Sequence, residues 1–191
     1  VVGTGNFQEV DLVKAFSTVA EFNHRVQGNS KHSELMSLAV KHAILNRDVS
    51  HLTFPDEVQE MPAPENATAQ TPEGRMPDME IRPSQASLDK AIGMFKEAKK
   101  PALLVGQGAR FHMNAIIAFA ESINAPIMTT FKGKGQISDS HPLGCGVLGR
   151  SGTPIASWFM NETDLLCVFG ASFSNHTGIN DHKPTIQVDF D

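Results

Sequence analysis

The stretch that decides the fold is Lys100-Pro101-Ala102-Leu103-Leu104-Val105-Gly106-Gln107-Gly108. A short apolar run that ends in Gly-x-Gly and precedes a helical pattern predicts a buried strand, a tight turn and a helix. In that geometry, backbone N–H groups after the strand can meet a phosphate. The dinucleotide-binding fingerprint requires a third glycine, and Phe111 stands at its position. The pattern alone therefore leaves two interpretations open, a nucleotide site and a strand-turn-helix unit without a ligand.

Apolar residues continue after this turn in a pattern that predicts alternating helices and strands. The next helix is expected to bury the stripe Ala115, Ile116, Phe119, Ala120 and Ile123. Residues 126–130, 165–170 and 186–190 read as three further strands, and residues 154–160 as a helix. Such alternation is typical of βαβ units and predicts an α/β fold with a parallel sheet.

The carboxyl ends of these strands are the expected ligand edge, because parallel sheets bind ligands there. Gly106, Thr130, Gly170 and Asp189 follow the four strands and would line this edge. A glycine-rich stretch, residues 131–152, is expected to form loops whose backbone can approach a ligand closely.

The amino-terminal part of the chain reads as the end of a separate α/β domain. Helical spacing over residues 11–26 and again over 33–43 predicts two helices, and alternation over 49–54 predicts a strand. Residues 61–82 contain four prolines and almost no large apolar side chains, which indicates a linker. We therefore expect an amino-terminal remnant over residues 1–60, a linker over 61–82 and a second domain over 83–191.

The composition of the chain limits the classes of function that it can have. The net charge of −5 over 191 residues argues against a general nucleic-acid surface, so a small-molecule partner is expected. No apolar stretch approaches about 18 residues and no leader pattern is visible, so we expect no membrane span and a cytoplasmic protein, with peripheral membrane contact left open. The two cysteines cannot build a disulfide framework, and the eight histidines lack ligand spacing, so no metal site is expected in this chain.

Six strings, taken in order and with their spacing, resemble those of one family. They are Phe7-Gln8-Glu9-Val10-Asp11, Pro55-Asp56-Glu57-Val58, Gly106-x-Gly108, Lys134-Gly135, His141-Pro142-Leu143-Gly144 and Ile186-Gln187-Val188-Asp189-Phe190-Asp191. The chain resembles the thiamine-diphosphate-dependent enzymes of the pyruvate oxidase and acetolactate synthase group. The resemblance is greatest to the flavin-dependent pyruvate oxidase or pyruvate:quinone dehydrogenase branch, notably around residues 43–47 and 61–65.

This resemblance implies a subunit of three α/β domains. Residues 1–60 would end the pyrimidine-binding domain, and residues 83–191 would form most of a Rossmann-like central domain that binds FAD or a similar dinucleotide. The glutamate that activates the aminopyrimidine would lie before residue 1, and the Gly-Asp-Gly motif for magnesium and diphosphate after residue 191. The resemblance also implies a homo-oligomer, a dimer or tetramer, and a fragment that is inactive alone.

The resemblance further implies thiamine diphosphate with Mg²⁺, FAD, and a 2-oxo acid substrate, pyruvate, whose hydroxyethyl intermediate is oxidised. Phe7 and Gln8 would lie near the thiazolium. Arg110, Lys134 and Arg150 would supply cations for a diphosphate, and Asp189 would accept from a ribose hydroxyl or adenine amine. The full set of implied FAD contacts is Gly106, Gly108, Ala109, Arg110, Thr130, Phe131, Lys134, Gly149, Arg150, Gly170, Ser172, Asp189 and Phe190.

Two alternatives stay open beside this hypothesis. One is an acetolactate synthase or other acyl-transferring relative in which the flavin is structural or absent. The other is a non-catalytic nucleotide-binding domain.

Overall fold

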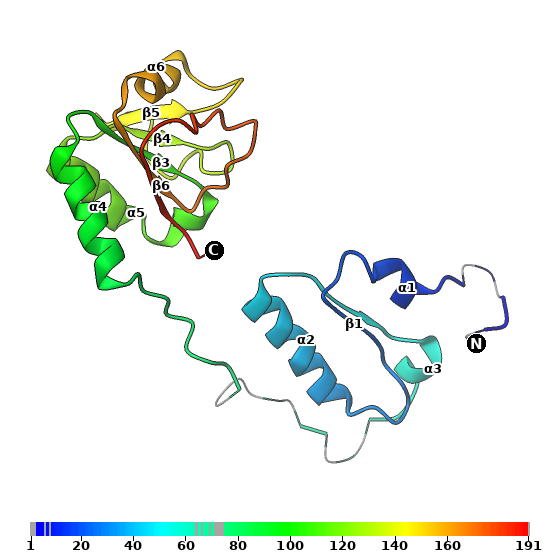
Figure 1. The fold of residues 1–191 in the computed structure, drawn as a ribbon. Coiled ribbons are helices and arrows are strands. Elements are labelled where there is room, and N and C mark those ends of the chain that lie inside the picture. Colours follow the sequence, from blue (N-terminus) through cyan, green and yellow to red (C-terminus); the bar gives the residue numbers. More distant parts are fainter. Residues whose placement is uncertain are drawn as a thin grey trace. The chain divides into compact units, whose positions relative to one another are not determined.

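A computed structural model describes residues 3–5, 7, 9–63, 65, 67–68, 70 and 75–190 of the chain (Figure 1). The chain divides into two compact units, Val1–Glu80 and Ile81–Asp191, and each is described by itself. Among the described residues, no helix combines the length and the apolar character needed to cross a bilayer.

The first unit contains a parallel pair of strands, β1 (Phe22–Arg25) and β2 (Ser50–Thr53), joined by α2 (His32–Asn46). The short helix α1 (Leu12–Phe16) precedes the pair, and α3 (Asp56–Gln59) follows it. The helix predicted over residues 33–43 and the strand predicted over 49–54 are confirmed by α2 and β2.

The helix predicted over residues 11–26 is wrong beyond Phe16, because β1 occupies its second half. Phe22 and Val26 are both buried, and a spacing of four residues puts two side chains on one face of a helix and also on one face of a strand. Hydrogen bonding to β2 makes this segment a strand. The order from α1 to β2 is therefore helix-strand-helix-strand rather than the predicted helix-helix-strand.

Both faces of this strand pair carry aromatic contacts. On one face, Asn23 Oδ1 lies 2.9 Å from His51 Nδ1, and the Phe16 ring of α1 stacks on the His51 ring with centroids 3.9 Å apart. On the other face, the Phe22 ring lies 4.7 Å from the His42 ring of α2. The two strands are thus sandwiched between α1 and α2.

The second unit begins with α4 (Gln85–Glu97), whose first turn is capped by Ser84 Oγ accepting from the Ser87 N–H at 3.2 Å. The described residues between α3 and α4 form no helix or strand. After α4, the chain enters a five-stranded parallel sheet with the spatial order β5-β4-β3-β6-β7. This confirms the predicted α/β class with a Rossmann-like parallel sheet.

The sheet elements follow one another along the chain in the alternation that the sequence predicts. They are β3 (Pro101–Val105), the 3-10 helix η1 (Gln107–Phe111), α5 (Met113–Ile123), β4 (Ile127–Thr129), β5 (Gly144–Val147), α6 (Pro154–Glu162), β6 (Leu165–Phe169) and β7 (Thr185–Val188). The four predicted strands and both predicted helices are confirmed.

Strand β5 lies in the glycine-rich stretch over residues 131–152, for which the sequence predicts loops, so this part of the prediction is wrong. Cys145 and Val147 are buried and alternate with Gly144 and Gly146, so the alternation of a strand is present. Because two of its four residues are glycine, β5 has few apolar side chains to mark it as a strand in the sequence. Its pairing with β4 stabilises it as a strand.

The core lies on both faces of this sheet. Alternate residues of β3 face opposite sides, so Leu103 and Val105 pack with Ile116 of α5, while Leu104 packs with Met160 of α6. Figure 1 shows α4 and α5 on one side of the strands and α6 on the other. The two helical layers leave the strand ends exposed for a site.

Candidate functional site

All five strands run in parallel, so their carboxyl ends meet at one edge of the sheet. Gly106, Thr130, Gly170 and Asp189 follow β3, β4, β6 and β7 directly at this edge. The chain moves outward from β3 to β4 and β5 and then returns across β3 to β6. The β3–β6 boundary is therefore the switch point, where open α/β sheets bind ligands.

The glycine turn at this switch point binds the neighbouring loop. The N–H of Gly106 donates to Phe169 O at 2.9 Å, that of Gly108 to Gly170 O at 3.0 Å, and that of Ala109 back to Gly106 O at 3.2 Å. A β-carbon on Gly106 would lie 2.2 Å from Gly170 O. These three N–H groups, for which the sequence leaves phosphate binding as one of two interpretations, donate to protein oxygens, and the glycines permit two loops to touch.

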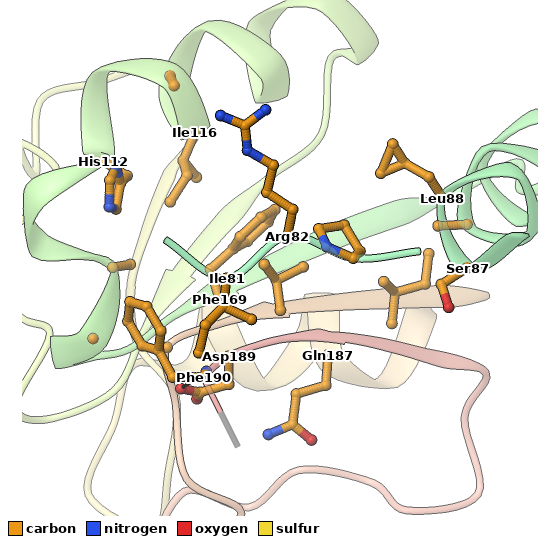
Figure 2. A pocket seen from close by; sticks show the side chains of 18 residues that line it. Ile81, Arg82, Ser87, Leu88, His112, Ile116, Phe169, Gln187, Asp189 and Phe190 are labelled. Carbon is orange, nitrogen blue, oxygen red and sulfur yellow. Dashed lines mark hydrogen bonds between the residues drawn. The ribbon is translucent and has the colours of Figure 1, made fainter. Parts of the chain in front are cut away.

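A pocket of about 640 Å³ opens beside this turn, between α4, α5 and the carboxyl ends of β6 and β7 (Figure 2). Its walls are mostly apolar and include Ile81, Leu88, Ile116, Phe169, Ile186 and Val188. Five of the predicted contacts line it, namely Gly108, Ala109, Gly170, Asp189 and Phe190. A pocket of this size and character is typical of small-molecule sites.

Sequence reasoning missed four polar residues of this pocket, of which Ser87 and Gln187 are uncharged and Arg82 and His112 are basic. Arg82 reaches it from the segment before α4, and His112 from the junction of η1 and α5, as Figure 2 shows. Neither residue belongs to a motif, so no local signal marks it. Their presence in the same pocket as Asp189 depends on how the chain folds back onto β7.

The three predicted cations lie outside this pocket. Arg110 Nη1 donates to Gln107 O at 3.0 Å, and its guanidinium stands 4.3 Å from the centre of the Phe111 ring. Lys134 Nζ forms an ion pair with Asp139 at 3.0 Å. The guanidinium of Arg150 has no ion-pair partner among the described residues.

A second group of predicted residues gathers where the loop after β5 meets the loop after β6. A β-carbon on Gly149, which has φ +141°, would lie 2.5 Å from His176 O and 3.1 Å from the Phe131 ring. The Arg150 N–H donates to His176 O at 3.4 Å. Phe131, Gly149 and Arg150 are therefore together, but apart from the residues that line the pocket.

The remaining predicted residues are placed as follows. Thr130 Oγ1 accepts from the Gly133 N–H at 3.1 Å, so it orders the loop after β4. Ser172 is exposed just beyond β6. In the first unit, Phe7 is 92% exposed, and Gln8 lies outside the described residues. No group of three or more His, Cys, Asp and Glu side chains in the described part of the chain could hold a metal ion.

Comparisons with known proteins locate this arrangement within a family. A family model described as "Thiamine pyrophosphate enzyme, central domain" matches residues 88–191. A protein of Bacillus subtilis, YdaP, whose name assigns it only to thiamine pyrophosphate-containing proteins, is 32% identical over 193 residues, covering 100% of this chain and 33% of the relative.

Two further relatives carry the names of enzymes. The "Probable acetolactate synthase large subunit" of Methanococcus aeolicus is 30% identical over 92% of this chain and 30% of its own length. The 3D-(3,5/4)-trihydroxycyclohexane-1,2-dione hydrolase of Geobacillus thermodenitrificans is 36% identical over 50% of this chain and 15% of its own. The chain spans about a third of the length of the first relatives that it matches.

Proposed function

This chain belongs to the family of thiamine pyrophosphate enzymes, and on that premise we propose that it is part of an enzyme that decarboxylates pyruvate while its central domain holds FAD. When bound, thiamine diphosphate with Mg²⁺ supplies an electron sink for decarboxylation, and FAD an acceptor for two electrons. The observation that carries the flavin part of the proposal is the pocket beside β7 (Figure 2).

The residues of this pocket fit the adenosine part of such a dinucleotide. Its apolar walls suit the faces of a flat heterocycle, with Phe169 and Phe190 offering rings. The Asp189 carboxylate at the end of β7 would accept from ribose hydroxyls or from the adenine amine. Arg82 and His112 would add donors on the opposite side. The chain's own part is thus to bind, to orient and to exclude water.

The diphosphate part would be held by side chains rather than by the glycine turn. The N–H groups of Gly106 and Gly108 are already engaged with protein carbonyls. Among the three predicted cations, Arg150 is the best candidate, since Arg110 stacks on Phe111 and Lys134 pairs with Asp139. A guanidinium matches two phosphate oxygens at once, which favours arginine for this role.

The flavin proposal is tested on the full-length protein by measuring the absorbance of flavin retained after desalting and the dissociation constant of FAD. Asp189→Asn should weaken FAD binding about tenfold or more, the size expected when a charge-assisted hydrogen bond is lost. Asp181→Asn, in the exposed loop before β7 and outside the pocket, makes the same charge change and should have no effect. Equal binding by the parent and the Asp189 variant would refute the role of Asp189, and absence of bound flavin would refute the cofactor.

The decarboxylation proposal has a separate readout, release of carbon dioxide from pyruvate with thiamine diphosphate and Mg²⁺. Absence of release by the full-length protein would refute it whether or not flavin binds. The oxidase branch rests on the motif resemblance, whereas the name of the Methanococcus aeolicus relative favours an acyl-transferring synthase. Pyruvate offered with a quinone or dye separates the two, because an oxidase reduces the acceptor and a synthase forms acetolactate without reducing it.

A further inference from the structure

A second cavity, of about 370 Å³, lies at the amino-terminal end of the sheet, away from the pocket beside β7. Its floor is the start of β3, Pro101 and Ala102, with Pro126 just before β4. The carboxyl ends of α5 and α6 form its walls. The residues that line it are Lys99, Lys100, Pro101, Ala102, Ile123, Asn124, Pro126, Trp158, Phe159, Glu162 and Thr163, none of which lines the first pocket.

The apolar side of this cavity is built around the single tryptophan of the chain. The Trp158 side chain is 54% exposed and meets the Phe159 ring edge-to-face, with centroids 4.9 Å apart. Ile155, one turn earlier on α6, is 49% exposed. An indole half in water at the rim of a cavity offers a flat surface to an apolar ring or branched chain.

Four charged residues, Lys99, Lys100, Glu162 and Asp164, lie at this side of the cavity. Lys100 Nζ and Glu162 Oε2 form an ion pair at 2.9 Å and neutralise each other. The Lys99 ammonium has no ion-pair partner in the part of the chain that the structure describes. The Asp164 carboxylate accepts from the N–H groups of Lys99 and Lys100 at 2.8 and 2.9 Å, which holds the turn that carries both lysines.

The helix ends that face this cavity do not favour a positively charged ligand. Carboxyl ends of helices carry partial negative charge, which would favour a positive ligand if it were exposed. Lys183 Nζ already donates to Thr163 O at 2.6 Å and to Asn161 O at the end of α6. At the end of α5, the Asn124 N–H donates back to carbonyls of the last turn. The Lys99 ammonium is therefore the cation at this cavity with which a ligand carboxylate could pair.

We propose that this cavity binds a small amphipathic carboxylate, with its apolar group against Trp158 and Phe159 and its carboxylate beside the Lys99 ammonium. The volume suits a ligand of about ten heavy atoms, at the lower limit of common small-molecule sites. This site is separate from the flavin pocket, so the proposal does not depend on the proposed function.

The test uses phenylacetate as the probe and Trp158 as the reporter. Trp158 is the single tryptophan of these 191 residues, and its indole N–H resonance and emission are identified by their loss in Trp158→Phe, so a change in either signal reports on this cavity. We expect a saturable shift with a dissociation constant on the order of 1 mM, as for a ligand of this size. The matched amine, 2-phenylethylamine, and the neutral 2-phenylethanol should bind at least about threefold more weakly.

Two lysine variants test whether the Lys99 ammonium binds the carboxylate of the probe. Lys99→Gln should weaken phenylacetate binding about three- to fivefold, the effect of one partly exposed ion pair, and leave Trp158 in place. Lys96→Gln, on α4 and outside the cavity, makes the same charge change and should bind as the parent does. The proposal is overturned by the absence of a saturable Trp158 shift, by equal affinities for the three probes, or by equal effects of the two variants.

Discussion

Gly108 touches Gly170 across the switch point of the sheet: its N–H donates to Gly170 O at 3.0 Å, and a β-carbon on Gly108 would lie 2.8 Å from Gly170 Cα. The neighbouring atoms are backbone and cannot rotate away. Gly108→Ala should therefore lower the free energy of unfolding by about 1–3 kcal/mol, the usual cost of overpacking. Denaturant unfolding of the parent and the variant measures this difference.

Gly93 supplies the matched control for that substitution. It lies inside α4, and a β-carbon there would have no heavy atom within 4 Å. Gly93→Ala should raise the free energy of unfolding by about 0.5–1 kcal/mol, since alanine loses less entropy than glycine in a helix. If both variants were stabilised, the close contact of Gly108 and Gly170 would not exist in solution.

Asp164 should make stability depend on acid pH. Burial acts to raise its pKa, but the N–H groups of Lys99, Lys100 and Asp164 itself outweigh burial and hold the pKa below its ordinary value of 3.8. A carboxyl whose pKa is lower in the folded than in the unfolded chain stabilises the fold above its unfolded pKa, and this stabilisation disappears as pH falls through the folded pKa.

Asp164→Asn should therefore lower the Tm near neutral pH, and the difference from the parent should shrink as the pH falls below the ordinary carboxyl pKa of 3.8. Thermal unfolding over a pH series measures it, with Asp181→Asn as the control in an exposed loop. A difference between parent and Asp164→Asn that is the same at every pH would rule out a role for the ionised carboxylate.

Lys183 should stabilise the end of α6. Its ammonium donates to the carbonyl oxygens of Asn161 and Thr163, which lack helical partners at this end. Lys183→Met keeps the aliphatic stem and removes the donors, so it should cost about 1 kcal/mol of unfolding free energy. Lys132→Met, at an exposed loop lysine, should cost nothing measurable in the same denaturant titration.

Both cysteines should resist thiol reagents in the folded protein. Burial raises the pKa of the Cys167 thiol to about 12, and burial also raises the pKa of Cys145 despite a backbone hydrogen bond that lowers it. The thiolate is the reacting species, and its fraction grows only as pH approaches the pKa. A colorimetric disulfide reagent at near-neutral pH should modify neither thiol until denaturant is added; immediate modification of either would contradict the burial of that residue.

The local sequence was enough to predict the helices and strands whose apolar residues follow a single clear periodicity. The run Pro101–Val105 reads as a buried strand because nearly every position is apolar, and in the fold it is the central strand. The stripe of α5 reads as a helix because Ile116 and Ala120 recur on one face. Burial of one face imposes the period of each element directly on the chain, so a single sequence reveals it.

Where that period is ambiguous or absent, only the tertiary structure determines whether a segment is a helix or a strand. Residues 22–26 fit a helix and a strand equally well, and only pairing with β2 selects β1. The glycines of β5 hide its alternation, and only the β4 neighbour makes it a strand. Hydrogen bonding between segments far apart in sequence leaves no local signal.

What each site residue contacts also depends on the tertiary structure. The sequence predicted a tight glycine turn after β3, with or without a ligand beside it. In the fold, the partner of Gly106 is Gly170, and the pocket instead joins Arg82, His112 and Asp189 from three separate segments. Strand order and connections bring such segments together, and these depend on packing over the whole sheet rather than on any one stretch of the chain.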